Sequence, residues 1–220
     1  MIKYHLAESF LSINGEGRLA GQLALFLRFC GCNLACSFCD TKWANEANCP
    51  YDECTVEDIL GIAEKAGVRN ITITGGEPLM QAGMAELLQA LSARKIYNLE
   101  IETNGSMPLE PFMNIPRVAF TMDYKLPGSG QEAKMHLPNL AILRREDTLK
   151  FVVGSREDML RAVEICEQYS LYGKTAIYFS PVFGSIAPEA IVDFMKEKQL
   201  VDVTLQLQMH KVIWGDKKGV

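Results

Sequence analysis

Short apolar segments alternate with amphipathic segments along most of the chain. Leu23–Phe29 (LALFLRF) and Arg69–Thr74 (RNITIT) are typical of buried strands, the second with β-branched residues at alternate positions. Thr55 and Asp58 occupy capping-box positions, with Asp in place of the usual Glu or Gln, and predict a helix from about Thr55 to Ala66. The same pattern predicts strands near Asn98–Glu102, Val118–Met122, Thr148–Val153, Thr175–Ser180 and Val203–Leu207, and helices near Ala82–Arg94, Arg156–Tyr169 and Pro188–Lys198.

Alternation of strands and helices favours a parallel sheet with right-handed crossovers. About six or seven strands are too few for a regular eight-stranded barrel. Periodicity alone leaves two folds open, an open doubly wound sheet and an incomplete barrel. In both, ligands bind at the carboxyl ends of the strands. Met1–Ile13 reads as a short β-rich segment before this pattern.

Composition narrows the class of protein. The chain has 220 residues, 48% hydrophobic and 22% charged, which is ordinary for a globular protein of one or two domains. A net charge of −5 gives no support for a broad basic surface that would bind nucleic acid. No apolar run is long enough to span a membrane, and the first residues lack the features of a signal peptide. We therefore expect no membrane partner and a cytoplasmic location.

The cysteines are the strongest chemical signal. The chain has seven, and four of them fall between Cys30 and Cys39. Such clustering in a reducing compartment indicates metal binding before a disulfide framework. Cys32, Cys36 and Cys39 have C-x3-C-x2-C spacing, which can ligate three irons of one [4Fe–4S] cluster and leave the fourth iron open.

Zinc is the main alternative from spacing alone. Cys36 and Cys39 form a C-x2-C half-site, and Cys30, Cys49 or Cys54 could complete the ligand set. A zinc site usually pairs two such half-sites, and the sequence has no second one. A thioredoxin-like motif is weaker, because it leaves Cys32 unexplained. We expect Cys30, at a strand end, to pack against its neighbours.

Polar or glycine-rich segments follow the predicted strands at their carboxyl ends. They are Gly75–Pro78 (GGEP), Glu102–Gly105 (ETNG), Asp123–Lys125 (DYK) and Ser180–Phe183 (SPVF). Each has an ordinary structural explanation as a turn or a solvated ion pair. Parallel strands nevertheless bring their carboxyl ends to one edge of a sheet, so these segments and the cysteine loop are expected to meet there.

C-x3-C-x2-C with Phe38 before the last cysteine, followed by a GGE segment, resembles the radical S-adenosylmethionine (SAM) superfamily. The resemblance implies an incomplete (β/α)6 barrel and a cluster whose open iron chelates the methionine of SAM. Reduction would then cleave SAM to a 5′-deoxyadenosyl radical. The SAM-binding residues it implies are Gly75, Gly76, Glu77, Glu102, Asn104, Asp123, Tyr124, Lys125, Ser180, Pro181, Val182 and Phe183.

Within this superfamily, four segments resemble the 7-carboxy-7-deazaguanine synthases: Ser12–Gly17, Arg28, Cys39–Thr41 and Gln208–Lys211. That family implies a lyase converting 6-carboxy-5,6,7,8-tetrahydropterin to 7-carboxy-7-deazaguanine and ammonia, in queuosine precursor biosynthesis. Hydrogen would be abstracted from C6 of the substrate and later returned, so that SAM acts catalytically. The resemblance further implies a homodimer and a flavodoxin or ferredoxin as electron donor.

The same resemblance assigns the substrate and metal residues. Thr41 would be a Mg²⁺ ligand. The commonest family form has Gln at the position of Asn14, so the shorter Asn side chain weakens that contact. The substrate residues implied are Ile13, Asn14, Gly15, Glu16, Arg28, Thr74, His210 and Val220.

Two other functions are compatible with parts of the sequence. A radical SAM activase acting on a protein would share the cysteines and GGEP but would not need Glu16, Arg28 and His210. A non-enzymatic, metal-stabilised binding domain would need neither SAM nor GGEP. We expect a single domain over residues 1–220, with an extension at 1–22 and a cluster-binding region at 30–54.

Overall fold

The computed structural model describes residues 2–215, 217 and 219 of the chain. Within them, one nine-stranded sheet has the order β3-β1-β2-β4-β5-β6-β7-β8-β9. From β2 onward neighbouring strands are parallel, whereas β1 is antiparallel to both β2 and β3. The strands are β1 Tyr4–Ile13, β2 Leu23–Phe29, β3 Asp52–Cys54, β4 Asn70–Gly75, β5 Asn98–Thr103, β6 Val118–Tyr124, β7 Thr148–Val153, β8 Ala176–Pro181 and β9 Val203–Leu205.

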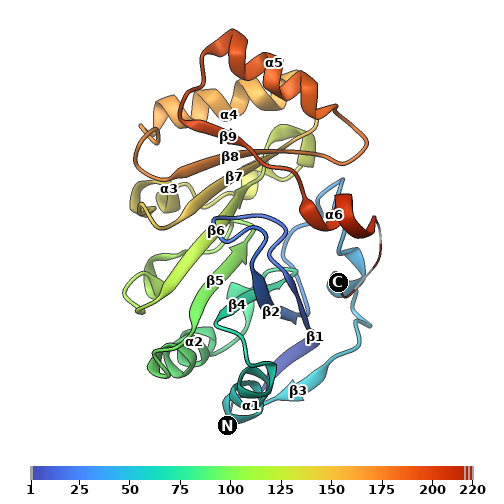
Figure 1. Ribbon diagram of the computed structural model, residues 1–220, viewed down its shortest axis with the longest axis vertical. Helices are drawn as coiled ribbons and strands as arrows, with labels where there is room; N and C mark the ends of the chain where they lie inside the picture. Colours follow the sequence, from blue (N-terminus) through green and yellow to red (C-terminus); the bar gives the residue numbers. More distant parts are fainter. Residues whose placement is uncertain (1, 216, 218, 220) are drawn as a thin grey trace.

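The sheet curves without closing, because β3 and β9 remain at its two edges (Figure 1). This confirms the incomplete barrel and decides against a flat doubly wound sheet. The helices are α1 Val56–Ala66, α2 Met84–Ala93, α3 Pro138–Ile142, α4 Arg156–Gln168, α5 Pro188–Lys198 and α6 Met209–Trp214. Helices α1, α2, α4 and α5 cover the outer side of the sheet, whereas α6 lies apart from them (Figure 1).

The helix boundaries follow from local chemistry. The hydroxyl of Thr55 accepts from the Asp58 amide, and the Asp58 carboxylate accepts from the Thr55 amide, so the predicted capping box is present. Helix α2 begins at Met84, later than predicted, because Gly83 has a left-handed conformation (φ 77°) just before it. The predicted strand Val203–Leu207 ends earlier, at Leu205.

Alternation along each strand separates the core from the site. Phe120, Phe151 and Phe179 are fully buried among the hydrophobic residues between sheet and helices. On each strand, the residues that alternate with the buried positions face the inner side of the sheet. Lys150 on β7 and Asp123 on β6 are two of these, and they are register partners. The inner side of the incomplete barrel is therefore polar, and it faces the loops at the carboxyl ends of the strands.

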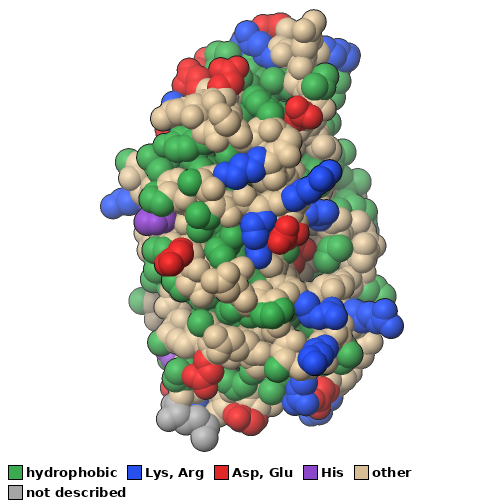
Figure 2. Space-filling view, turned by 90° about the vertical axis from the view of Figure 1, so that its left-hand side faces the viewer, with side chains coloured by type: hydrophobic (Ala, Val, Ile, Leu, Met, Phe, Trp, Pro, Cys, Tyr) green, Lys and Arg blue, Asp and Glu red, His purple; other side chains and the backbone are tan. Residues whose placement is uncertain are grey.

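The surface drawn in Figure 2 has no broad basic area, as the net charge of −5 suggests. On the face drawn in Figure 2, Lys and Arg side chains lie interspersed with Asp and Glu side chains. In the described part of the chain, no helix is both long and apolar enough to cross a membrane.

Candidate active site

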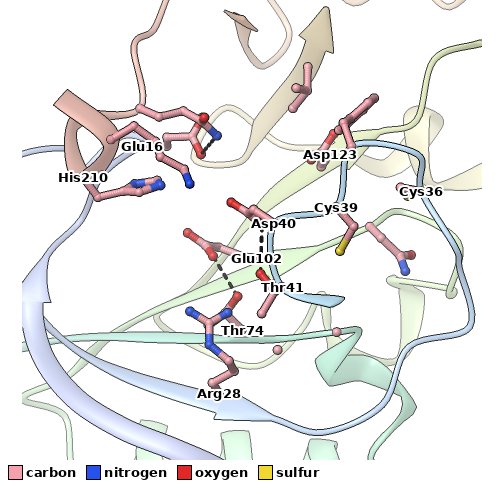
Figure 3. Close-up of a pocket in the computed structure, with 18 of the residues that line it drawn as sticks. Glu16, Arg28, Cys36, Cys39, Asp40, Thr41, Thr74, Glu102, Asp123 and His210 are labelled. Atoms are coloured by element: carbon pink, nitrogen blue, oxygen red, sulfur yellow. Dashed lines mark hydrogen bonds between the residues drawn. The ribbon is translucent and has the colours of Figure 1, made fainter. Parts of the chain in front are cut away.

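A pocket of about 740 Å³ opens at the carboxyl ends of the parallel strands. Its walls come from the cysteine loop, from the ends of β4, β5, β6 and β8, from the loop after β1, and from α6. The segments that the sequence places at successive strand ends therefore converge on one cavity, as expected. Figure 3 shows several of these side chains pointing toward a common space.

The thiols of Cys32, Cys36 and Cys39 are free and line this pocket. The backbone amide of Leu34 lies 3.4 Å from the Cys32 sulfur, and the side-chain amide of Asn104 lies 3.5 Å from it. Such donors stabilise a thiolate. Burial nevertheless raises the pKa of Cys32 and Cys36, which favours the protonated thiols when no metal is bound. Binding a metal would therefore release their protons. The donor set fits an iron–sulfur cluster with one open iron.

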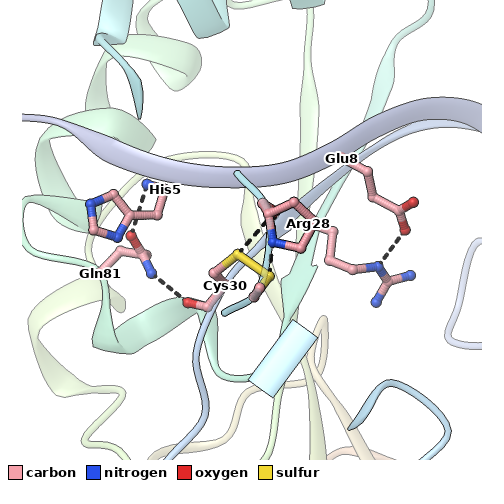
Figure 4. Close-up of a disulfide and its surroundings, with 7 residues drawn as sticks. His5, Glu8, Arg28, Cys30 and Gln81 are labelled. Atoms are coloured by element: carbon pink, nitrogen blue, oxygen red, sulfur yellow. Dashed lines mark hydrogen bonds and ion pairs between the residues drawn. A yellow bond between two sulfur atoms is a disulfide. The ribbon is translucent and has the colours of Figure 1, made fainter. Parts of the chain in front are cut away.

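Cys30 and Cys49 form a disulfide (Figure 4). This corrects the expectation that Cys30 merely packs at its strand end. It also removes two of the three cysteines that a zinc site would have recruited. The bond closes a loop that contains all three free cysteines of the motif, and the carbonyl of Cys30 accepts from the side-chain amide of Gln81 at 2.9 Å. Within the described residues, no three His, Cys, Asp or Glu side chains are placed to hold a single metal ion.

The two glycines after β4 let this strand end pack against the cysteine loop. A β-carbon at Gly75 would collide with the carbonyl of Phe29, and one at Gly76 would lie 2.6 Å from the β-carbon of Cys32. Only glycine fits both positions. Gly75 and Gly76 consequently form a wall of the pocket beside the thiols.

Glu77 has a different environment from the one the motif suggests. Its side chain is fully buried and does not line the pocket. Its oxygens accept from the Thr103 hydroxyl at 2.9 and 3.0 Å, from the Asn104 amide at 2.7 Å and from the Leu79 amide at 3.0 Å. Desolvation raises its pKa to about 7 in spite of these donors. Glu77 thus holds the ends of β4 and β5 together from behind the pocket.

Most of the other predicted SAM residues do line the pocket, and two do not. The phenol of Tyr124 points to the helix side, 3.3 Å from Glu132, because residues next to each other on a strand face opposite sides. Ser180 is fully buried and donates to Glu16 at 2.8 Å. The predicted SAM residues in the wall are Gly75, Gly76, Glu102, Asn104, Asp123, Lys125, Pro181, Val182 and Phe183.

On the substrate side, Glu16 is the best-connected predicted residue. Besides Ser180, it accepts from Lys150 at 3.2 Å and from Gln208 at 3.4 Å. Asn14 lies behind the wall, where its side-chain carbonyl accepts from the Thr72 hydroxyl at 2.6 Å. The side chain of Asn14 is therefore part of the barrel floor rather than of the pocket surface.

Two further predicted residues are held by acidic neighbours. The guanidinium of Arg28 donates through Nε to Glu8 at 2.7 Å (Figure 4). The hydroxyl of Thr74 donates to Glu102 at 2.8 Å (Figure 3). Glu8 stands on β1, where no motif marks it. Its contact leaves the terminal nitrogens of Arg28 to face the pocket.

Thr41 and His210 complete the pocket. The Thr41 hydroxyl donates to Asp40 at 2.8 Å, which leaves its lone pairs available to a ligand (Figure 3). His210 on α6 lies against Gly15, and Ile13 is part of the wall as predicted. Val220, the remaining predicted substrate residue, lies outside the described residues.

Several polar residues of the wall were given no role from the sequence, among them Glu8, Asn45, Thr121, Lys150 and Ser185. Asp40 and Gln208 also line the wall; they stand in the segments Cys39–Thr41 and Gln208–Lys211, which the family resemblance marked without giving these two residues a role. Lys150 had a usable signal, because a lysine inside the apolar strand Thr148–Val153 (TLKFVV) needs a buried partner. Glu8 had none, because only the register of β1 against β2 brings it beside Arg28.

Comparison with known proteins defines the family. The Radical SAM superfamily profile matches residues 27–126. A 7-carboxy-7-deazaguanine synthase of Clostridium acetobutylicum is 52% identical over 221 residues, covering 100% of both chains. One of Leptospira interrogans is 34% identical and covers 100% of this chain and 99% of its own. The crystal structure of QueE from Escherichia coli superposes with a TM-score of 0.75 at 23% identity, over 94% of this chain and 95% of that one, and shows the same fold. The chain therefore belongs to the 7-carboxy-7-deazaguanine synthase family of radical SAM enzymes.

Proposed function

We propose that this pocket converts 6-carboxy-5,6,7,8-tetrahydropterin to 7-carboxy-7-deazaguanine and ammonia, in the biosynthesis of queuosine and related deazapurines. One observation carries the proposal: three free thiols line the same pocket as Glu16, Arg28 and His210. An enzyme of this superfamily that acts on a protein needs the thiols but not this second set. The relatives named for this activity match the full length of the chain.

Cys32, Cys36 and Cys39 would hold the [4Fe–4S] cluster, and the walls formed by Gly75, Gly76 and the ends of β5, β6 and β8 would hold SAM. Bound together, these cofactors supply the one-electron chemistry that starts the reaction. Glu102, Asn104 and Asp123 offer acceptors to the ammonium and hydroxyl groups of SAM. Lys125 offers a cation to its carboxylate. Glu77 would act through the backbone of the strand ends rather than by direct contact.

Arg28 and Glu16 would orient the pterin. Because Glu8 fixes Nε of Arg28, the two terminal nitrogens of the guanidinium can form a paired contact with the substrate carboxylate or with ring acceptors. Glu16, an acceptor only, suits the donor–donor edge of the pterin ring. Thr74 and His210 would add hydroxyl and imidazole contacts from β4 and α6. These contacts fix the face of the ring that meets SAM.

Thr41 would contribute a ligand to Mg²⁺, with the substrate carboxylate and water completing the sphere. A threonine hydroxyl beside the Asp40 carboxylate gives the oxygen-rich surroundings that Mg²⁺ prefers. The ion would neutralise the substrate carboxylate as charge develops in the ring.

We place the enzyme in the cytoplasm as a homodimer reduced by a flavodoxin or ferredoxin. A one-electron carrier is required because the cluster must be reduced once per initiation. The pocket has the dimensions of a small-molecule site, and charges of both signs alternate on the face in Figure 2, so we propose no nucleic-acid or membrane partner.

The test is product analysis under strict exclusion of oxygen. Reconstituted enzyme with SAM, reductant, Mg²⁺ and 6-carboxytetrahydropterin is expected to give 7-carboxy-7-deazaguanine, identified by mass spectrometry, and Cys36→Ala is expected to give none. If 5′-deoxyadenosine accumulates while the pterin remains intact, the protein-activase alternative gains and the proposed substrate is excluded.

A further inference from the structure

Four charged side chains lie in a row across the floor of the pocket. Lys125 contacts Asp123 at 2.8 Å, Asp123 lies 3.6 Å from Lys150, and Lys150 contacts Glu16 at 3.2 Å. Cations and anions alternate in this row. Lys125 and Asp123, at one end, lie among the residues proposed for SAM, and Glu16, at the other end, lies among those proposed for the pterin.

We propose that Lys150 is a positioning residue that holds Glu16 for the pterin and neutralises Asp123 in the SAM site, so that one side chain aligns both ligands. This inference deepens the proposed function and rests on it for the identity of the pterin. Neither the motifs nor the strand-end pattern assigns this lysine.

The location of Lys150 supports a role beyond folding. Its side chain is 12% exposed and that of Glu16 is 9% exposed, so the ion pair is shielded from water and from salt. Burial alone would lower the pKa of Lys150, but Glu16, Asp123 and Glu102 raise it, so the ammonium remains charged. A cation at this depth is retained at a desolvation cost, which its anionic partners offset.

One atom of the row has an unsatisfied hydrogen-bonding capacity that a ligand could fill. Asp123 Oδ1 is buried and has no hydrogen-bond partner among the described residues. Asp123 lies between two cations, 2.8 Å from Lys125 and 3.6 Å from Lys150. Lys150 also contacts Glu16, so it is the cation that connects Asp123 to Glu16.

Glu16 depends on Lys150 for its orientation. One carboxylate oxygen accepts from Ser180 and the other from Lys150 and Gln208. Without the lysine, the contact with Gln208 at 3.4 Å is the weakest of the three and would not fix the second oxygen. The carboxylate would then rotate and lose the geometry that a paired donor edge requires.

The test measures binding rather than turnover alone. Anaerobic equilibrium dialysis of cluster-loaded enzyme gives the Kd for SAM and for 6-carboxytetrahydropterin. Lys150→Met is expected to raise both by about tenfold or more, whereas Lys150→Arg keeps the charge and is expected to stay within about threefold for SAM. Lys196→Met, an exposed lysine on α5, is the matched control and should change neither.

A double-mutant cycle separates positioning from a general loss of structure. Glu16→Gln and Lys150→Met are expected to be strongly non-additive for pterin binding, because each removes the same contact. If Lys150→Met fails to fold, Asp123→Asn combined with Lys150→Met restores the charge balance. That variant should fold and still bind the pterin about tenfold more weakly than Asp123→Asn.

Unchanged Kd values in Lys150→Met, or additive effects in the cycle, would overturn the role of Lys150. Failure of the wild-type enzyme to bind the pterin would instead remove the proposed substrate, and the SAM measurement would still decide whether Lys150 serves Asp123.

Discussion

Gly15 lies directly against the imidazole of His210, so closely that a β-carbon at position 15 would collide with Nδ1. The amide of Met209 also donates to the carbonyl of Gly15 at 3.1 Å. The loop after β1 and helix α6, which are far apart in sequence, thus meet at one glycine. This contact brings His210 into the pocket.

Gly15→Ala is therefore expected to push His210 and α6 outward. We expect KM for the pterin to rise by about tenfold while cluster content remains unchanged, because a displacement of this kind costs a ligand contact without touching the cysteines. Steady-state kinetics and iron analysis measure the two quantities. Gly61→Ala is the control, since a β-carbon there meets no atom within 4 Å. Equal KM values for the two variants would refute the role of this contact.

Glu8 is expected to aim Arg28. In Glu8→Gln the charge-assisted contact is lost and the guanidinium can turn away, so the Kd for the pterin should rise by about five- to tenfold. Equilibrium dialysis measures this, with Glu53→Gln on the edge strand β3 as the control for loss of a carboxylate. If Glu8→Gln bound the pterin as tightly as the control, the contact with Glu8 would not be needed to orient Arg28.

The ionisation of Glu100 should make the free energy of unfolding depend on pH. Burial raises its pKa to about 7, and the Thr121 hydroxyl donates to one of its oxygens at 2.6 Å. A carboxyl group with a raised folded-state pKa contributes stability that is fully present below its unfolded value of 4.5 and is lost as pH rises through about 7. The wild-type protein should thus lose up to about 3 kcal/mol of unfolding free energy over this window relative to Glu100→Gln.

Urea denaturation of the metal-free protein at pH 5 and pH 8 measures the difference. The variant should be the less pH-dependent of the two and the more stable at pH 8. Glu53→Gln, which alters an exposed carboxylate, should leave the wild-type dependence intact. Parallel stability curves for wild type and Glu100→Gln would show that Glu100 is not the group responsible.

The disulfide between Cys30 and Cys49 should stabilise the cysteine loop only when oxidised. Their separation of 19 residues corresponds to about 3 kcal/mol, or roughly 6–12 °C in Tm. Under oxidising conditions, Cys30→Ser with Cys49→Ser should melt lower than wild type by this amount. In reductant, which keeps both thiols free in the wild type, the two proteins should melt together. A difference that persisted in reductant would mean that the two thiols stabilise the loop by packing instead.

Most strands and helices of the fold could be predicted from the sequence, because their bounds depend on neighbouring residues. Strand Thr148–Val153 and helix Pro188–Lys198 have the predicted bounds, and the Thr55 capping box forms as read. Period-two alternation also explains why Asp123 reaches the pocket and Tyr124 does not, which a motif read as three consecutive letters obscures. Helices α3 and α6 and strand β3 were missed, since they are short and depend on distant contacts.

The partners of the site residues were not encoded locally. The contact of Lys150 with Glu16 joins β7 to the loop after β1, and that of Arg28 with Glu8 joins β2 to β1. Only the fold brings these partners together. The burial of Glu77 could not be read from GGEP, because the motif fixes the backbone turn but not the direction of the carboxylate. The pairing of Cys30 with Cys49 likewise required the path of the loop.

We infer that this pocket rearranges a carboxytetrahydropterin with SAM acting as a catalyst. The most direct measurement is the ratio of 7-carboxy-7-deazaguanine formed to SAM consumed in one anaerobic reaction with excess pterin and limiting SAM. We expect many molecules of product for each SAM consumed, and none with Cys36→Ala. SAM consumption without the deazapurine would show that the pocket does not rearrange this pterin.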